Sequence, residues 1–333
     1  MVWQRGETRM IISRTPVRIS FVGGGTDLPG YYRTGFGAVV STAIQYYIYV
    51  IAKKRFEDSY RISYSETEIT DKLEEIKHGL IREAIRMVDV PKYLEILTLA
   101  DIPGKGTGLG SSGSLSVGLL NALYKFIGII QNKEFLAREA CRLEIDILKK
   151  SCGKQDQYAA SFGGLNYIQF NKDESVIVEP IKLSSNTLNE LEDSLMLFYT
   201  NITRPSDTIL PYQARNIPNR MEILDKMKDQ AVKLRDMLRD NDISELGNML
   251  HQGWTYKKQL AKGISNPIID SYYHKAMKAG ALGGKISGAG GGGFLLLYVE
   301  RKDQDRVREV LSNLKEVEVR FDSDGTSIIY EKR

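Results

Sequence analysis

A segment rich in glycine and serine, PGKGTGLGSSGS at residues 103–114, contains the residue types best suited to binding an anion. Glycine lets the main chain approach a ligand closely, and the apolar helical pattern that follows would add the N–H groups and dipole of a helix N-terminus. Ser111 and Ser112 supply hydroxyl groups and Lys105 supplies a positive charge. We predict that this loop binds phosphate groups; the alternative is a long turn that only packs a helix against a strand.

Two familiar nucleotide-binding motifs do not account for this loop. The pattern GxxxxGK[ST] is absent, because no Gly-Lys pair of the chain is followed by serine or threonine. Gly108, Gly110 and Gly113 match GxGxxG formally. A Rossmann site, however, needs an acidic residue at the end of the next strand, and the candidate Glu134 begins a predicted helix instead.

Glu144 lies where a charged side chain is least expected. A helix is predicted over residues 133–150, and at about 100° per residue Glu144 falls in the middle of its apolar arc. A buried carboxylate is costly unless it is paired or binds a cation. We therefore expect Glu144 either to bind Mg²⁺ beside the phosphate loop, since Mg²⁺ on phosphates takes only one or two protein oxygens, or to form a buried pair with Arg or Lys.

Asp156 and two arginines are further candidates. Asp156 precedes a short predicted helix, where it either takes part in a reaction or is only an acid favoured by the helix dipole. Arg14 and Arg18 alternate along the first predicted strand and are expected to point the same way, toward a carboxylate or a phosphate. The three histidines lack the spacing of a metal site or of a Ser-His-Asp triad, so hydrolase chemistry is not expected.

The predicted strands and helices would position these residues. Strand patterns surround a glycine break in residues 10–54, and a strand at 93–100 runs into the phosphate loop, giving the order strand, loop, helix. Past about residue 185, one strand precedes long helical patterns at 215–261 and 267–279, and strands return around a further glycine cluster, KISGAGGGGF. An α+β architecture of two closely packed lobes is predicted.

Composition excludes several classes of protein. The 333 residues are 42% hydrophobic and 26% charged, which excludes a fibrous or mainly disordered chain. Because 46 Lys+Arg and 42 Asp+Glu leave a net charge of only +4, no nucleic-acid partner is expected. The apolar runs are far shorter than the ~20 residues of a membrane helix, residues 1–9 lack the apolar core of a signal peptide, and two cysteines are too few for a disulfide scaffold. We expect a cytoplasmic protein without a membrane partner, starting at Met1 or Met10.

Three motifs occur in order along the chain: PVR at 16–18 with GGGTD at 23–27, PGKGTGLGSSGS at 103–114, and KISGAGGGG at 285–293. Together they resemble the GHMP small-molecule kinases, over nearly the whole chain. Within that superfamily, RTPVRISFVGGGTDLPGYY is similar to the D-glycero-α-D-manno-heptose 7-phosphate kinases. The resemblance implies an α+β fold of two lobes, a ribosomal-S5-like N-terminal lobe over 10–185 and a ferredoxin-like C-terminal lobe over 186–333.

The resemblance also implies roles for individual residues. In GHMP kinases the middle loop surrounds the ATP phosphates, a serine and a downstream glutamate bind Mg²⁺, and an aspartate with a nearby arginine lies beside the attacking hydroxyl. The catalytic positions that match are Asp156 and Arg18, and the Mg²⁺ ligands are Ser112 and Glu144. The residues expected to contact ATP are Lys105, Gly106, Gly108, Gly110, Ser111, Ser112, Gly113 and Ser114. Those expected to contact the sugar are Gly24, Gly25, Thr26, Asp27, Gly288 and Gly290.

The implied reaction is ATP-dependent phosphorylation of the anomeric (C1) hydroxyl of D-glycero-α-D-manno-heptose 7-phosphate, for nucleotide-activated heptose and surface polysaccharide. Galactokinases have Gly-Glu-His-Thr-Asp where residues 23–27 read Gly-Gly-Gly-Thr-Asp, which disfavours galactose and leaves a fucose or N-acetylhexosamine 1-kinase as the alternative. A non-catalytic sensor of sugar and ATP is the alternative of another class. For the distal phosphate of the heptose, Arg14 and Arg204 are the candidates, followed by Arg33 and Arg215. A homodimer stays open.

Overall fold

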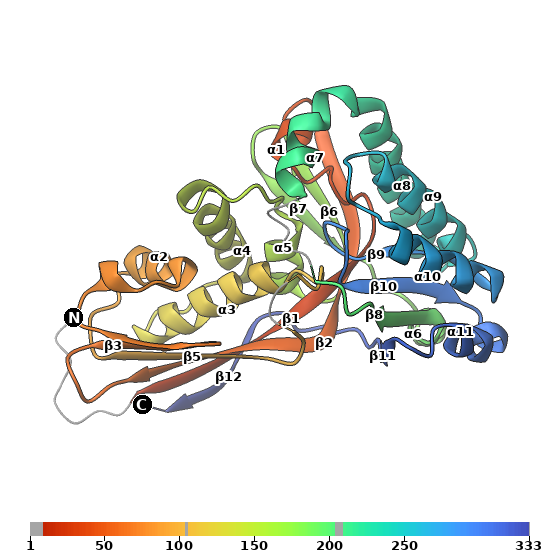
Figure 1. Ribbon diagram of the computed structural model, residues 1–333. Coiled ribbons are helices and arrows are strands. Elements are labelled where there is room, and N and C mark those ends of the chain that lie inside the picture. Colours follow the sequence, from red (N-terminus) through yellow and green to blue (C-terminus); the bar gives the residue numbers. More distant parts are fainter. Residues whose placement is uncertain (1–8, 104–105, 204–208, 333) are drawn as a thin grey trace.

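The computed structural model describes residues 9–103, 106–203 and 209–332, which form two β-sheets covered by helices (Figure 1). The larger sheet has eight strands, which are, in order across the sheet, β12 (Ser327–Lys332), β1 (Met10–Val22), β2 (Phe36–Lys54), β5 (Leu94–Ala100), β3 (Tyr60–Ser63) and β4 (Thr67–Thr70), with β6 (Leu165–Asn171) on β2 and β7 (Val176–Pro180) on β6. The smaller sheet has four, in the order β11 (Lys315–Val317), β8 (Leu195–Tyr199), β10 (Phe294–Val299) and β9 (Ala281–Ile286). The predicted α+β class is confirmed.

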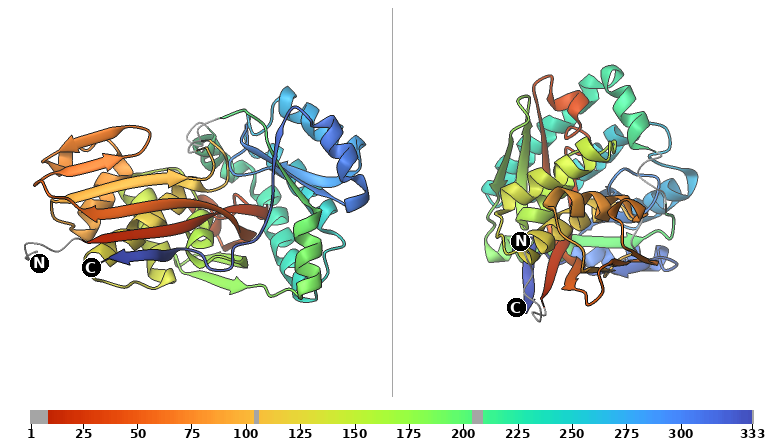
Figure 2. Two further views of the ribbon diagram at one scale, coloured as in Figure 1. Left: turned by 90° about the horizontal axis from the view of Figure 1, so that it is seen from below. Right: turned by 90° about the vertical axis from the view of Figure 1, so that its left-hand side faces the viewer.

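One face of the larger sheet is covered by helices (Figures 1 and 2). These are α2 (Gly79–Val88), α3 (Ser111–Phe126), α4 (Lys133–Cys141) and α5 (Gln155–Phe162). Helix α3 is apolar around most of its circumference, because it is enclosed by the sheet and by its neighbouring helices, with Val117, Leu120 and Leu123 fully buried. The glycine loop therefore leads into a helix whose first turn is held in place by the core.

The second lobe places helices α8 (Met221–Arg239), α9 (Leu246–Lys258) and α10 (Pro267–Lys278) on the side of the smaller sheet, together with α6 (Ser185–Ser194) and α11 (Gln304–Val310). Helix α7 (Leu210–Asn216) lies apart from that sheet, beside α1 (Pro29–Tyr32) (Figure 1). The long helical pattern predicted over 215–261 is two main helices, because α8 ends before Asn241, whose φ is 59°. A shared apolar core joins the lobes: Val17 of β1 packs in one cluster with Leu234 of α8 and Leu250 of α9.

Two boundaries differ from the prediction. The final strand β12 does not belong to the second lobe, since it pairs antiparallel with β1 in the larger sheet, so the division at residue 186 is wrong for the end of the chain (Figure 2). Strand β2 pairs with one edge of β1, and β12 supplies hydrogen-bond partners for the backbone groups on the opposite edge of β1. The helix predicted over 133–150 ends as α4 at Cys141 and continues as a π-helical turn, η2 (Arg142–Ile147), which contains Glu144.

None of the helices in the described part of the chain combines the length and the apolar character needed to cross a bilayer.

Candidate active site

Two glycine loops from different lobes pack directly against each other. Phe294 donates its N–H to the carbonyl of Thr107 at 3.2 Å, and a Cβ on Gly108 would collide with the carbonyl of Ser287. Gly108 also has a positive φ of 76°, so no other residue fits there. The backbone of 106–110 is therefore positioned by the 287–294 loop of the second lobe, and it delivers the chain to the N-terminus of α3.

The N-terminus of α3 has backbone donors but no side-chain cap. Gly110 occupies the N-cap position with φ 78°, and no side chain accepts a hydrogen bond from the first turn. The N–H groups of Ser111, Ser112 and Gly113 therefore open the helix, where an anion is favoured by the dipole. The Ser114 hydroxyl is used internally, since it donates to the carbonyl of Pro16 at 2.8 Å.

The buried Arg18 forms an ion pair with the partly exposed Asp156 beside this helix end. Arg18 is only 2% exposed, and it donates from Nε and Nη2 to Oδ1 of Asp156 at 2.9 and 2.6 Å and from Nη1 to the carbonyl of Gly108 at 2.7 Å. A Cβ on Gly113 would lie 2.7 Å from that of Asp156, so α3 and α5 approach closely here. The two expected catalytic residues are thus together, with Oδ2 of Asp156 outside the arginine contact.

The loop at residues 23–27 packs beside the same pair. Asp27 is 4% exposed and accepts from the N–H of Gly25 at 2.9 Å and of Gln155 at 3.4 Å. Burial raises the pKa of Asp27, and the charge of Asp156 acts in the same direction, while the backbone donors oppose it. The Thr26 side chain, expected to contact sugar, instead fixes the loop: its hydroxyl donates to the carbonyl of Gly23 at 2.8 Å and accepts from the N–H of Ala38 at 2.9 Å.

Glu144 lies under the first turn of α3 and is 2% exposed, as its place on the apolar arc predicted. Oε1 accepts from Ser116 at 2.8 Å and Gln157 at 3.1 Å, and Oε2 accepts from Ser112 at 2.5 Å and from Nζ of Lys150 at 2.9 Å. The ion pair with a lysine that was expected as one alternative is therefore present, but only its carboxylate is buried, because the Lys150 side chain is 31% exposed. A Mg²⁺ site, the other alternative, also fits, because the carboxylate of Glu144 and the hydroxyl oxygen of Ser112 lie together. The ammonium of Lys150 already bridges these oxygens, since its Nζ is 2.8 Å from Ser112 Oγ. No group of three or more acidic, His or Cys ligands occurs among the described residues.

Several expected residues lie elsewhere or outside the described part of the chain. Lys105 and Arg204 fall outside the described residues. Arg14 does not point the same way as Arg18: its guanidinium lies 4.5 Å over the ring of Tyr47 and 3.9 Å from Asp324. Between the two arginines the pairing of β1 with β2 shifts register, with Gln45 and Tyr46 as extra residues on β2, so the regular pairing assumed in the prediction does not hold here. Among the remaining arginines, Arg33 pairs with Glu174 and Arg215 lies over Tyr212.

Two buried lysines and a glutamine were not anticipated. Lys257 on α9 and Lys285 on β9 are 4% and 3% exposed, and they donate to the carbonyls of Gly288 and Phe21 respectively. Gln213 of α7 is also buried, with its amide against Gly25. A sequence signal for Lys257 existed, because its spacing from the buried positions Leu250 and Trp254 puts it on the apolar face of α9, the argument that identified Glu144.

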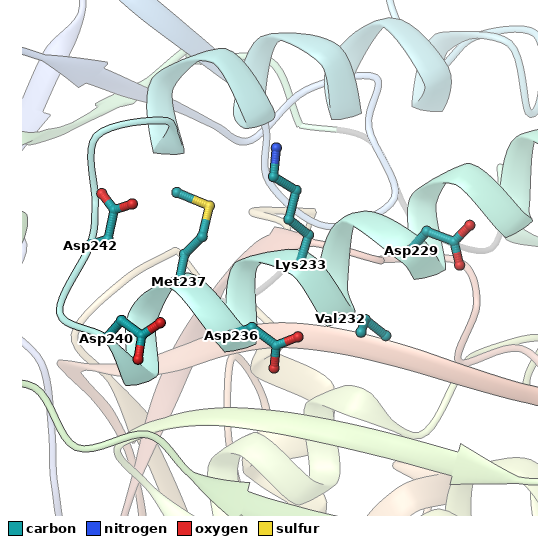
Figure 3. A pocket seen from close by; sticks show the side chains of 7 residues that line it. All are labelled: Asp229, Val232, Lys233, Asp236, Met237, Asp240 and Asp242. Atoms are coloured by element: carbon teal, nitrogen blue, oxygen red, sulfur yellow. The ribbon is translucent and has the colours of Figure 1, made fainter.

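A surface depression on α8 and the turn after it is separate from these loops (Figure 3). Its lining is mostly charged and consists of Asp229, Val232, Lys233, Asp236, Met237, Asp240 and Asp242. None of the site residues described above contributes to it, so the site is defined by the loop contacts and not by this depression.

Replacing Lys150 with methionine is expected to destabilise the ligand-free protein. The buried carboxylate of Glu144 would lose its only cationic partner among the described residues, and a hydrogen bond to a charged group is worth about 1–3 kcal/mol. Thermal unfolding should therefore occur several degrees lower without ligand, and Mg²⁺ with ATP should reduce the difference. The neighbouring Lys149→Met is the control, since Lys149 is exposed. Equal unfolding temperatures for Lys150→Met and wild type would contradict the assigned role.

The chain matches known proteins at both lobes. Residues 75–164 match the GHMP kinases N terminal domain, and residues 234–318 match the GHMP kinases C terminal domain. A D-glycero-alpha-D-manno-heptose 7-phosphate kinase of Campylobacter jejuni is 31% identical over 306 residues, which cover 88% of this chain and 90% of that protein. An L-fucokinase/L-fucose-1-P guanylyltransferase of Bacteroides fragilis is 27% identical over 91% of this chain and 36% of its own length.

Solved structures agree with these matches. A structure described as a D-glycero-D-manno-heptose 1-phosphate kinase from Bacteroides thetaiotaomicron superposes with a TM-score of 0.80 at 28% identity, covering 96% of this chain and 99% of that one. The similarity therefore extends over both lobes.

Proposed function

The chain belongs to the GHMP kinase family, and from that premise we propose that it is an ATP-dependent sugar kinase that phosphorylates the C1 hydroxyl of D-glycero-α-D-manno-heptose 7-phosphate. The observation that carries the reaction type is the Arg18–Asp156 pair beside the uncapped N-terminus of α3. This arrangement places a carboxylate that can accept the proton of a hydroxyl nucleophile beside backbone N–H groups that can bind phosphates. The heptose phosphate is supported by the name of the 31% identical relative.

Asp156 would accept the proton of the attacking hydroxyl. Arg18 holds Oδ1 through two N–H groups and keeps the carboxylate oriented, which leaves Oδ2, on a side chain that is 29% exposed, for the substrate. The sugar O1 forms its bond to the γ-phosphorus of ATP, the bond from that phosphorus to the β–γ bridging oxygen breaks, and the proton passes to Asp156. Positioning of the two reactants supplies much of the rate in phosphoryl transfer.

The phosphates of ATP would bind along the loop 106–110 and the first turn of α3, through the N–H groups of Ser111, Ser112 and Gly113. Ser112 and Glu144 would hold Mg²⁺, which when bound supplies charge neutralisation on the phosphates. Two oxygens from the protein suffice for Mg²⁺ on a nucleotide.

A panel of sugars tests the proposal. With ATP and Mg²⁺, heptose 7-phosphate should have a higher kcat/KM than heptose, fucose or an N-acetylhexosamine, and phosphorus NMR should locate the new phosphate on C1. Fucose is the second candidate because a fucokinase is 27% identical over 91% of this chain. Preference for fucose would reject the heptose phosphate while keeping the kinase. Absence of ATP turnover with every sugar would favour a non-catalytic sensor of sugar and ATP. The presence of Ser112, Glu144 and Asp156 together at the site argues against that function.

A further inference from the structure

Lys257 is a buried ammonium group that forms no ion pair with a carboxylate of the described residues. Its side chain lies on the apolar face of α9, is 4% exposed, and forms no ion pair in the described part of the chain. Its Nζ donates a hydrogen bond to the carbonyl oxygen of Gly288. Because an ammonium has three donors and a buried charge is costly when unpaired, this lysine has capacity for an anion.

The carboxylates of Asp27 and Asp156 act on Lys257 from nearby, but neither forms an ion pair with it among the described residues. Burial raises the pKa of Asp27 and lowers that of Lys285 well below its usual value, so burial disfavours the charged form of each group. Arg18 is bound to Asp156, whereas Lys257 has no ion-pair partner in the described part of the chain. Burial and the positive charge of Arg18 lower the pKa of Lys257 to about 8, against the opposing charges of Asp27 and Asp156, so Lys257 is mostly protonated at pH 7.

Lys257 is also next to the reaction site. Gly288, whose carbonyl it binds, packs so closely on Gly108 that a Cβ would collide, and Gly108 in turn accepts from Arg18, the partner of Asp156. Arg18, Asp27 and Asp156 are near enough for their charges to act on the Lys257 pKa. An anion on Lys257 would thus lie close to a sugar whose C1 hydroxyl is at Asp156.

We propose that Lys257 binds the phosphate that a phosphorylated sugar carries away from its reacting hydroxyl, so that the site selects sugar phosphates over neutral sugars. This inference rests on the proposed kinase function and assigns its substrate selectivity to a residue of α9. Lys257 takes the role that was expected of Arg14, whose guanidinium is engaged by Tyr47 and Asp324 instead. An ammonium on a phosphate forms a charge-assisted hydrogen bond.

The experiment compares Lys257→Met with Lys258→Met, its neighbour on the same helix, which lies over Trp254 at 5.9 Å. Lys257→Met should raise KM for heptose 7-phosphate about 10- to 100-fold, the value of a hydrogen bond to a charged group. KM for ATP and for unphosphorylated heptose should change less than about threefold, and Lys258→Met should resemble wild type. Calorimetric titration with heptose 7-phosphate, without ATP, should show the same weakening.

A pH series gives an independent readout. Lys257 is protonated below its pKa of about 8 and loses the proton above it, so wild-type affinity for heptose 7-phosphate should fall from pH 7 to 9. The sugar phosphate itself is already a dianion over this range. Lys257→Arg keeps its charge at pH 9 and should bind with little pH dependence, which also tests the inference if Lys257→Met fails to fold.

The outcomes separate the two proposals. Should wild type prefer a neutral sugar, the heptose phosphate assignment and the inference both fail. If wild type prefers the sugar phosphate and Lys257→Met keeps that preference, only the inference fails and Lys257 is structural. The same conclusion follows if Lys257→Met raises the KM for ATP and the KM for the sugar phosphate equally. A selective loss for the phosphorylated sugar supports both.

Discussion

Replacing Asp156 with asparagine is expected to lower kcat by about 10²–10⁴-fold, the usual contribution of a positioned general base. Asparagine keeps the size of the side chain and an oxygen for Arg18, but it cannot take a proton from the attacking hydroxyl. Because the phosphate-binding N–H groups of α3 are untouched, KM for ATP should change only slightly. Steady-state kinetics with heptose 7-phosphate and ATP measure both parameters.

Asp270→Asn is the matched control for this variant. Asp270 also lies in the first turn of a helix, α10, and accepts a hydrogen bond from Ser265. Its replacement therefore measures how much activity is lost when a first-turn charge is removed far from the site. The control should keep wild-type kcat. A kcat for Asp156→Asn within a few-fold of wild type would make Asp156 a structural residue.

Replacing Glu144 with glutamine is expected to lower kcat at least about 100-fold and to raise the Mg²⁺ concentration needed for half-maximal activity. Glutamine offers Mg²⁺ a neutral oxygen in place of a carboxylate, so the ligand pair with Ser112 loses its charge. Mn²⁺ binding followed by electron paramagnetic resonance, in the presence of ATP, reports the metal directly. It should weaken in parallel with activity.

Two comparisons test whether the effect belongs to the metal. Glu139→Gln removes a carboxylate five residues earlier, on α4, where its partner is Arg142 at 3.1 Å, and it should leave Mg²⁺ dependence unchanged. Glu144→Gln combined with Lys150→Met should recover stability without recovering activity, because the buried pair is then removed on both sides. Unaltered Mg²⁺ dependence in Glu144→Gln would assign the carboxylate to the core alone.

Much of the candidate site was accessible to sequence reasoning because its chemistry is carried by contiguous residues. The glycine loop at 103–114 and the helix after it are adjacent in the chain, so their order predicted an anion site at the start of α3. Glu144 could be identified because a charge on an apolar helical arc is conspicuous wherever the helix packs. Asp156 and Arg18 required the resemblance of several motifs to one family, since 138 residues separate them.

The sequence by itself determined the α+β class, the glycine loop that leads into α3 and the burial of Glu144, because these depend on local periodicity and on the conformational preferences of neighbouring residues. Only the tertiary structure decided which cations reach the site. Contacts with Tyr47 and Asp324 hold Arg14 away from Asp156, and the packing of α9 on the smaller sheet brought Lys257 to Gly288. Register and packing depend on partners distant in the chain, and local preferences do not encode them.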